Sequence, residues 1–155
     1  MEVTLRNLKI SDINKNYLSW FKSRNVKFIE NAKQQKSIEN LKNYYLNLKR
    51  ENKKTLFLAI ISKKKLHIGN IKFEESNIKG KVYMGILIGN TKYTNIGLSE
   101  IIFKKSEKIF KREFKINKYF LRVKYSNILA VKSYLKNNFK IVHKNKKYIE
   151  MVKII

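Results

Sequence analysis

The sequence predicts an α+β fold with strands and helices in the order β-α-α-β-β-β-α-β-α-β-β. The 155 residues include 43% hydrophobic side chains, which is typical of a globular protein with one substantial core. Short apolar runs of strand length alternate with stretches in which apolar residues recur every three or four positions. No linker-like segment divides the chain, so we expect a single domain over residues 1–155.

The N-terminal third contains one predicted strand and two predicted helices. Alternating apolar residues between Val3 and Ile10 indicate the strand. Ser11 or Asp12 can cap the first helix, and Ser37 can cap the second. The apolar residues of these helices are Ile13, Tyr17, Leu18, Trp20 and Phe21 in the first, and Ile38, Leu41, Tyr44, Tyr45 and Leu48 in the second. The polar stretch between the helices, residues 25–35, reads as irregular.

Three strands are predicted in the middle of the chain. Leu56–Ile61 is an apolar run that reads as a buried strand, and Lys63–Lys65 turns the chain into Leu66–Phe73. A second turn at Asn77–Gly80 leads to the strand Val82–Ile88.

The last third contains two further helices and three strands. An amphipathic pattern begins near Leu98 and predicts a long helix. The remaining elements are the strand Tyr119–Tyr125, the short helix Asn127–Lys136, and a hairpin of Phe139–His143 and Tyr148–Ile154 around Asn145.

The chain carries a formal net charge of +25, from 36 Lys and Arg against 11 Asp and Glu. Such a field attracts polyanions, which include nucleic acids, anionic membranes and phosphorylated small molecules. Only five of the cations are arginines, although base recognition and bidentate phosphate contacts favour arginine. We therefore interpret most of the lysines as a solvated surface, part of which steers an anionic substrate or cofactor.

Several classes of protein are excluded or disfavoured by composition. The absence of cysteine excludes disulfides and thiolate metal sites, and His67 and His143 are too isolated for a recognisable metal motif. We expect no metal. The N-terminus lacks the apolar segment of a signal peptide, and no apolar run approaches membrane-spanning length. These features predict a cytoplasmic protein without a membrane span.

The segment Asn90–Ser99 joins the strand Val82–Ile88 to the helix that begins near Leu98. A strand that feeds a glycine-containing turn and then a helix N-terminus presents unpaired backbone N–H groups to an anion. This geometry suits a pyrophosphate group.

Four segments, taken in order, resemble the GNAT family of acyl-CoA N-acyltransferases over essentially the whole chain. They are Leu66-His-Ile-Gly-Asn-Ile, Met84-Gly-Ile-Leu-Ile-Gly, Tyr93-Thr-Asn-Ile-Gly-Leu-Ser, and the block from Leu121 to Phe139. Residues 17–26 are similar to the branch that contains ribosomal-protein N-terminal acetyltransferases and bacterial surface-sugar N-acetyltransferases. The resemblance implies a mixed, mostly antiparallel central sheet with helices on both faces, and acetyl-CoA as co-substrate.

Two positions depart from the family pattern. Thr94 stands where the phosphate loop of the family usually has Gln or Arg, and the last small residue of that loop is Ser99. Asn138 replaces the usual glycine before Phe139. Because asparagine tolerates positive φ better than most residues, we expect this turn to survive.

The resemblance assigns cofactor contacts and a proton donor. Tyr134 would protonate the departing CoA thiolate, because a phenol stays protonated at neutral pH; the alternative is an aromatic residue packed in the core. The implied cofactor-binding residues are Leu87, Ile88 and Gly89 for the pantetheine arm, Thr94, Asn95, Ile96, Gly97, Leu98 and Ser99 for the pyrophosphate, and Asn127 at the start of the later helix.

The general base has three candidates. Symmetric pairing around Asn77–Gly80 gives opposed residues whose numbers sum to about 155, which brings His67 near Ile88. His67 can then relay a proton; the alternative is a surface histidine among lysines. Glu30, in the stretch that forms the acceptor side in this family, is a second candidate, and its alternative is an ordinary exposed carboxylate. A chain of waters without a single base is the third.

Three residues are candidates for the acceptor site. The same pairing suggests a bulge at Gly69–Asn70 that aims Asn70 inward, opposite Gly85. Tyr17 and Trp20 lie three residues apart and share a helix face, so they form either a wall of the acceptor pocket or part of the core.

The expected function is transfer of an acetyl group to a primary amine by direct attack on the thioester. The candidate acceptor is a small molecule such as a nucleotide-linked amino sugar, and the alternative acceptor is a protein N-terminus. A function of another class is a non-catalytic basic module that binds nucleic acid. No stacking motif interleaves aromatic residues with Lys or Arg, so we expect no specific nucleic-acid partner.

Overall fold

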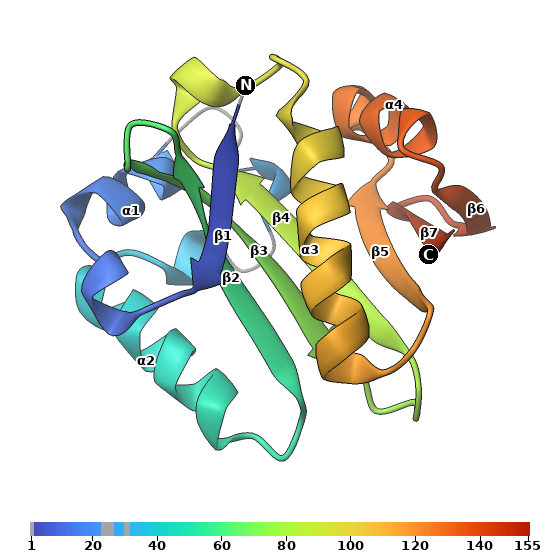
Figure 1. Ribbon diagram of the computed structural model, residues 1–155, viewed down its shortest axis with the longest axis horizontal. Coiled ribbons are helices and arrows are strands. Elements are labelled where there is room, and N and C mark those ends of the chain that lie inside the picture. The colour runs from blue at the N-terminus through green and yellow to red at the C-terminus, as the bar shows by residue number, and fades with distance from the viewer. Residues whose placement is uncertain (1, 23–26, 30–31) are drawn as a thin grey trace.

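The computed structural model describes residues 2–22, 27–29 and 32–155. In this part of the chain, seven strands form one sheet in the order β1-β2-β3-β4-β5-β7-β6 (Figure 1). Only the β4–β5 pair among them is parallel, so the sheet is mixed and mostly antiparallel, as expected. The strands are β1 (Val3–Asn7), β2 (Thr55–Ser62), β3 (His67–Glu75), β4 (Val82–Ile88), β5 (Lys118–Lys124), β6 (Lys140–Lys144) and β7 (Tyr148–Ile154).

The α-helices follow the predicted order. They are α1 (Lys15–Ser19), α2 (Ile38–Arg50), α3 (Leu98–Phe114) and α4 (Ile128–Lys136). Short 3₁₀ turns accompany them: η1 (Ile10–Asp12), η2 (Trp20–Lys22), η4 (Ala32–Gln34) and η5 (Thr91–Tyr93). The strands and helices alternate as the apolar periodicity predicts, and the α+β fold class is confirmed.

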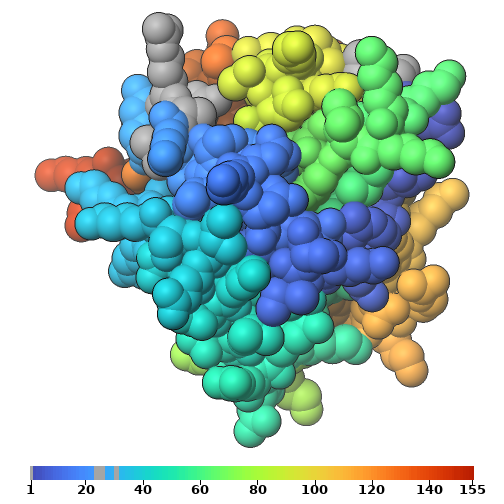
Figure 2. Space-filling view, turned by 90° about the vertical axis from the view of Figure 1, so that its left-hand side faces the viewer, coloured from blue at the N-terminus to red at the C-terminus, as the bar shows by residue number. Residues whose placement is uncertain are grey.

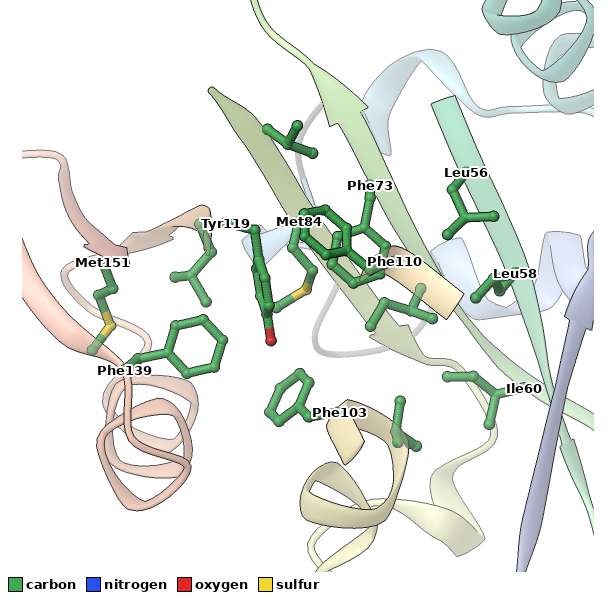
Figure 3. Packing of buried hydrophobic residues seen from close by; sticks show 14 of the residues in the cluster. Leu56, Leu58, Ile60, Phe73, Met84, Phe103, Phe110, Tyr119, Phe139 and Met151 are labelled. Carbon is green, nitrogen blue, oxygen red and sulfur yellow. The ribbon is translucent and has the colours of Figure 1, made fainter. Parts of the chain in front are cut away.

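The two faces of the sheet have separate cores. On one face, α3 crosses the strands (Figure 1), and its Phe110 packs with Phe73 and Tyr119 at ring-centroid distances of 4.8 and 5.3 Å (Figure 3). On the other face, α1 and α2 bury a smaller cluster that includes Leu41 and Tyr45. Figure 2 shows the N-terminal segments that cover this side of the molecule. Helices therefore lie on both faces of the sheet.

The first helix does not begin where the sequence suggested. Asn14 caps α1, because its side-chain oxygen accepts hydrogen bonds from the backbone N–H groups of Asn16 (3.0 Å) and Tyr17 (3.2 Å). Asp12 instead receives two hydrogen bonds of 2.7 Å from the Arg6 guanidinium and one from the Lys9 N–H. A carboxylate held in this way closes η1 and is not available to cap a helix.

The pairing of β3 with β4 differs from the expected register by two residues. Opposed residues sum to 157, so Asn70 lies opposite Leu87, and Lys72 lies opposite Gly85. The loop closes through the hydrogen bond from the Ser76 N–H to the Lys81 carbonyl, so the turn is centred between Ile78 and Lys79, which is also the centre of a symmetric Asn77–Gly80 turn. The expected sum of about 155 placed this centre one residue too early. An even shift leaves every side chain on its expected face.

The bulge in β3 lies just before the predicted position. Ile61 of β2 pairs with His67, whereas Ile60 pairs with Gly69, so Ile68 is the extra residue. A side chain on Gly69 would approach the Leu87 carbonyl to 2.3 Å, which explains the glycine at this bulge.

Candidate active site

The sheet opens between β4 and β5. These two strands pair through a single residue pair, Tyr83 with Phe120. Beyond this pair, β5 stays bonded to β7, whereas β4 has no strand partner on its β5 side among the described strands. Gly85 of β4 is exposed, and no atom of the residues that the structure describes lies within 4 Å of the position that a Cβ would occupy there. The second half of a central strand is therefore accessible from the sheet edge that faces β5.

Two backbone units of β4 point into this opening. Gly89 donates its N–H to the Ile68 carbonyl, and Ser76 donates to the Lys81 carbonyl at the other end of the same ladder. Because hydrogen-bonded pairs alternate along an antiparallel ladder, the peptide groups of Ile86 and Ile88 face away from β3. Of the predicted pantetheine-binding residues, Ile88 thus offers its backbone to the opening. The Gly89 N–H is already bonded to the Ile68 carbonyl. The N–H and carbonyl of Leu87 also face β3, because residues two apart in a ladder point the same way.

The predicted phosphate loop lies directly after this strand and ends at the N-terminus of α3. Asn95 and Gly97 have φ angles of +58° and +78°, and Gly97 caps α3 without a side-chain hydrogen bond. The first N–H groups of α3 therefore remain available to an anion. The Thr94 hydroxyl donates to the Thr91 carbonyl at 2.8 Å, Ile96 is exposed, and Leu98 anchors the helix in the core.

Ser99 links α3 to α4. Its Oγ lies 3.1 Å from the Oγ of Ser133, and the Asn137 amide nitrogen lies 3.4 Å from the Ser99 Oγ. Asn137 also donates to the Ser133 carbonyl at 2.8 Å and is itself buried. The Ser99 hydroxyl thus faces α4, and the network holds α4 beside the anion-binding end of α3. The sequence analysis did not predict a role for Ser133 and Asn137. The available signal was the position of these polar residues on the inner side of a short helix.

Asn127 and Tyr134 lie at the two ends of α4. Asn127 caps the helix through a 3.3 Å hydrogen bond from the Ala130 N–H to its side-chain oxygen. The Tyr134 ring packs against Phe103 and Phe139 at 6.2 and 5.4 Å between centroids. Burial raises the pKa of Tyr134 to about 12, so its phenol keeps the proton at neutral pH. Two residues after α4, Asn138 has a φ of +66°, so asparagine serves in place of the expected glycine in the turn before Phe139.

His67 lies in a small polar cluster at the start of β3. Its Nε2 is 2.7 Å from the Oδ1 of Asn70, and its ring packs edge-on against Trp20 at 4.9 Å. The Nδ1 of His67 and the Nδ2 of Asn70 are buried and have no hydrogen-bond partner among the described residues. With the Asn70 oxygen as acceptor, Nε2 carries the proton and the basic nitrogen is the buried Nδ1. His67 is therefore a packed residue and not a surface histidine.

Tyr17 and Trp20 lie in the core beneath the end of β4. Their exposed fractions are 5% and 2%, and their rings contact each other at 4.9 Å between centroids. A Cβ on Gly89 would come within 1.9 Å of the Trp20 ring, so the indole lies close against the backbone where β4 ends. The structure favours the packing alternative for both residues, which support the strand end and the His67 ring from below.

Solved structures of N-acetyltransferases share this architecture. A chimera of the spermidine N-acetyltransferase SpeG from Vibrio cholerae and hSSAT has a TM-score of 0.79 at 17% identity, covering 99% of this chain and 96% of that chain. PaiA N-acetyltransferase from Thermoplasma acidophilum, in complex with coenzyme A, has a TM-score of 0.77 at 21% identity, covering 100% of both chains. The Vibrio cholerae spermidine N-acetyltransferase in complex with CoA and spermine has a TM-score of 0.70 at 19% identity, covering 98% of this chain and 95% of that chain.

The chain has the GNAT fold. No family model matches the sequence, and no curated protein matches it. The described ranges contain no helix long and apolar enough to cross a membrane. They also contain no group of three or more His, Cys, Asp or Glu residues that could hold a metal ion. Glu30, the other candidate base, lies outside the residues that the structure describes.

One side of the opening in this GNAT fold is lined by a charged cluster that the sequence did not reveal. Arg122 of β5 lies over the rings of Tyr83 and Tyr148, at 4.7 and 5.1 Å from their centroids, and donates a 3.0 Å hydrogen bond to the Tyr83 hydroxyl. Glu150 of β7 is 8% exposed and accepts from Tyr83 and from Lys81 (3.0 Å). Burial raises the pKa of Glu150, but the Tyr83 hydroxyl and the neighbouring cations lower it by more.

Lys72 of β3 flanks the same opening from the other side. Its ammonium group donates to the Tyr44 hydroxyl of α2 at 2.7 Å and pairs with Glu74. Burial lowers the pKa of Lys72, but Tyr44 and Glu74 raise it by more, so the side chain stays charged. Lys72, Gly85 and Arg122 come from three different strands. The order of the strands in the sheet brings them together, so this cluster was not predictable from local sequence.

Proposed function

We propose that this chain is an acetyl-CoA-dependent N-acetyltransferase that acts on a primary amine of a small molecule. The observation that carries the proposal is the departure of β4 from β5 after Tyr83, which exposes the peptide groups of Ile86 and Ile88 just before the open N-terminus of α3. Unpaired peptide groups followed by a helix N-terminus match a ligand that carries amides next to a pyrophosphate. The related fold of PaiA, solved with coenzyme A, supports the same assignment.

The residues present fit acetyl-CoA, because backbone groups can bind its pyrophosphate without a cationic side chain in the loop. Ile86 and Ile88 would bond the amides of the pantetheine arm, and the backbone between Asn95 and Ser99 would hold the pyrophosphate. Glu100 in the first turn of α3 opposes an anion there, whereas the net charge of +25 favours one. The role of Asn127 is to fix the start of α4 beside this path.

The chemistry is one acyl transfer. The neutral amine attacks the thioester carbonyl, a C–N bond forms, and the C–S bond breaks with its electron pair on sulfur. Tyr134 gives its proton to the departing thiolate and regains one from solvent. The amine's own surplus proton leaves through water in the open space over Gly85. Positioning of both partners supplies most of the rate in such a reaction.

His67 acts in this scheme as a positioning residue. Its Nε2 is engaged by Asn70 and its Nδ1 is buried, so neither nitrogen reaches an acceptor directly. The pair orients Asn70 beside Leu87 at the end of β4. Glu30 is the alternative base in this proposal.

The acceptor lies over Gly85, on the sheet face that α1 and α2 partly cover. A small amine is the proposed class, because neighbours with this fold are named for spermidine and one was solved with spermine. A nucleotide-linked amino sugar and a protein N-terminus are narrower candidates within the same chemistry.

Two measurements test the proposal. Acetyl-CoA at about a hundred times its dissociation constant should stabilise the protein by about 2.7 kcal/mol, which raises Tm by about 5–10 °C for a domain of this size. A Cβ at Gly85 meets no atom of the described residues within 4 Å, so Gly85→Leu should fill the acceptor space. It should keep this thermal shift and lose CoA release with a panel of amines, whereas Gly85→Ala keeps both. Absence of a thermal shift in the parent at millimolar acetyl-CoA and low salt would refute the assignment.

A further inference from the structure

We propose that the acceptor amine carries an anionic group, a phosphate or a carboxylate, and that Arg122 binds this group. The inference rests on the proposed N-acetyltransferase function and narrows its substrate class. It separates this chain from the polyamine enzymes that share its fold, because a polyamine is a cation.

The open space over Gly85 has a cation on each side. Gly85 lies opposite Lys72 in the β3–β4 ladder, and opposed residues share a face of the sheet. Arg122 lies two residues beyond Phe120, the last partner of β4, and contacts Tyr83 on that face. Any molecule that rests on Gly85 therefore lies between the strand of Lys72 and the strand of Arg122.

The neighbours of the Arg122 guanidinium hold it in place, and those that the structure describes leave several of its N–H donors available. Two tyrosine rings contact it, and the Tyr83 hydroxyl accepts one of its five N–H donors. Its Nε lies 3.7 Å from the Glu150 carboxylate, too far for a hydrogen bond, and the side chain is 53% exposed. A rigid, partly exposed guanidinium with unused donors is well suited to a phosphate or carboxylate.

Among the residues that the structure describes, two carboxylates lie near the opening, and they do not make it acidic. Glu150 is buried and already accepts from Tyr83 and Lys81, and Glu74 is paired with Lys72. Lys124 adds a fourth cation at the far end of β5, where it donates to the Lys27 carbonyl. Four cations against two paired carboxylates leave this face positive among the described residues, which disfavours a cationic acceptor by direct repulsion.

The test compares amines with and without an anionic group, and the protein is saturated with CoA so that its cofactor anion site is filled. Calorimetry at low salt compares glucosamine 6-phosphate with glucosamine, β-alanine with β-alaninamide, and both pairs with spermidine. The anionic member of at least one pair should bind about tenfold more tightly than its neutral partner, and the preferred pair tells phosphate from carboxylate. Initial rates with acetyl-CoA should show the same order in kcat/KM.

Arg122→Gln should raise the KM for the anionic amine and reduce its preference over the neutral amine about tenfold. Lys104→Gln removes the same charge from an exposed position of α3, which lies on the opposite face of the sheet. This control variant should leave the preference for the anionic amine intact. Spermidine bound or acetylated as well as the anionic amines, or equal effects of both variants, would overturn the inference while the acetyltransferase assignment stands. Loss of the assignment itself would appear separately, as failure to bind acetyl-CoA.

Discussion

Three glycines of the β3–β4 pair serve three different purposes. Gly69 leaves room for the Leu87 carbonyl, Gly89 leaves room for the Trp20 ring, and the Cβ position of Gly85 meets no atom from the described part of the chain. The first two avoid a clash within the protein, so their absence of a side chain is structural. Only Gly85 leaves space that a bound acceptor could occupy. A sequence shows that a residue is glycine but not what lies above it, so these roles were not predictable.

Tyr134 provides the sharpest residue-level prediction. Tyr134→Phe removes the proton donor and keeps the ring that packs against Phe103 and Phe139. We expect kcat to fall by about 10²–10⁴, with the KM for acetyl-CoA changed only a few-fold. Steady-state rates of CoA release measure this, and Tyr125→Phe, an exposed tyrosine, is the control. Turnover within a few-fold of the parent would make Tyr134 a packing residue.

At the scale of elements, the ion pair between Arg6 and Asp12 ties β1 to the turn that leads into α1. Burial raises the pKa of Asp12, but the Arg6 guanidinium and the Lys9 N–H lower it by more. A carboxyl whose folded pKa is depressed stabilises the protein above its unfolded value of about 3.9. That contribution disappears as the pH falls through the folded pKa.

Asp12→Asn should therefore destabilise the protein at pH 7, and the destabilisation should be smaller near pH 3. The Arg6 side chain is 40% exposed, so solvent screening limits the loss to about 1 kcal/mol, or about 2–4 °C in Tm. Thermal melts between pH 3 and pH 7 measure the difference, with Glu51→Gln at an exposed position as the control. An equal loss at both ends of this pH range would show that the charge of Asp12 is not responsible.

The elements themselves were largely predictable, but their ends and registers were not. β4 and β7 have the predicted bounds, because alternating or continuous apolar residues stop at polar turns. The cap of α1 was wrong because three polar residues compete within four positions, and only tertiary contact with Arg6 decides which one caps. The β3–β4 register was wrong because the expected sum placed the centre of the turn one residue too early, although a symmetric Asn77–Gly80 turn gives the observed register.

Part of the candidate site was predictable from local sequence, and part was not. The strand, loop and helix around Gly97 follow from local sequence, and the structure forms them as expected. Glu150, Arg122 and Lys72 come from β7, β5 and β3, and nothing in their local sequence distinguishes them from surface charges. Their proximity depends on strand order, which local periodicity does not encode.

At the scale of the whole molecule, the charge of +25 predicts binding to any polyanion without selectivity. We expect weak association with DNA and RNA that falls steeply as salt rises and does not depend on sequence, since most of the cations are lysines. Fluorescence anisotropy with several sequences between 50 and about 300 mM salt measures this. Tight, sequence-selective binding that survives high salt would favour the basic nucleic-acid-binding module over the enzyme.

The departure of β4 from β5 also has a consequence for the dynamics of the backbone. Ile86 and Ile88 lie in the middle of the sheet, yet their amides have no strand partner on the β5 side. In amide hydrogen exchange they should behave like an outer strand and exchange quickly, whereas their neighbours bonded to β3 are protected. An extended ligand that pairs with these two amides would complete the sheet, so acetyl-CoA should slow exchange at alternate residues of β4 and leave β1 unaffected.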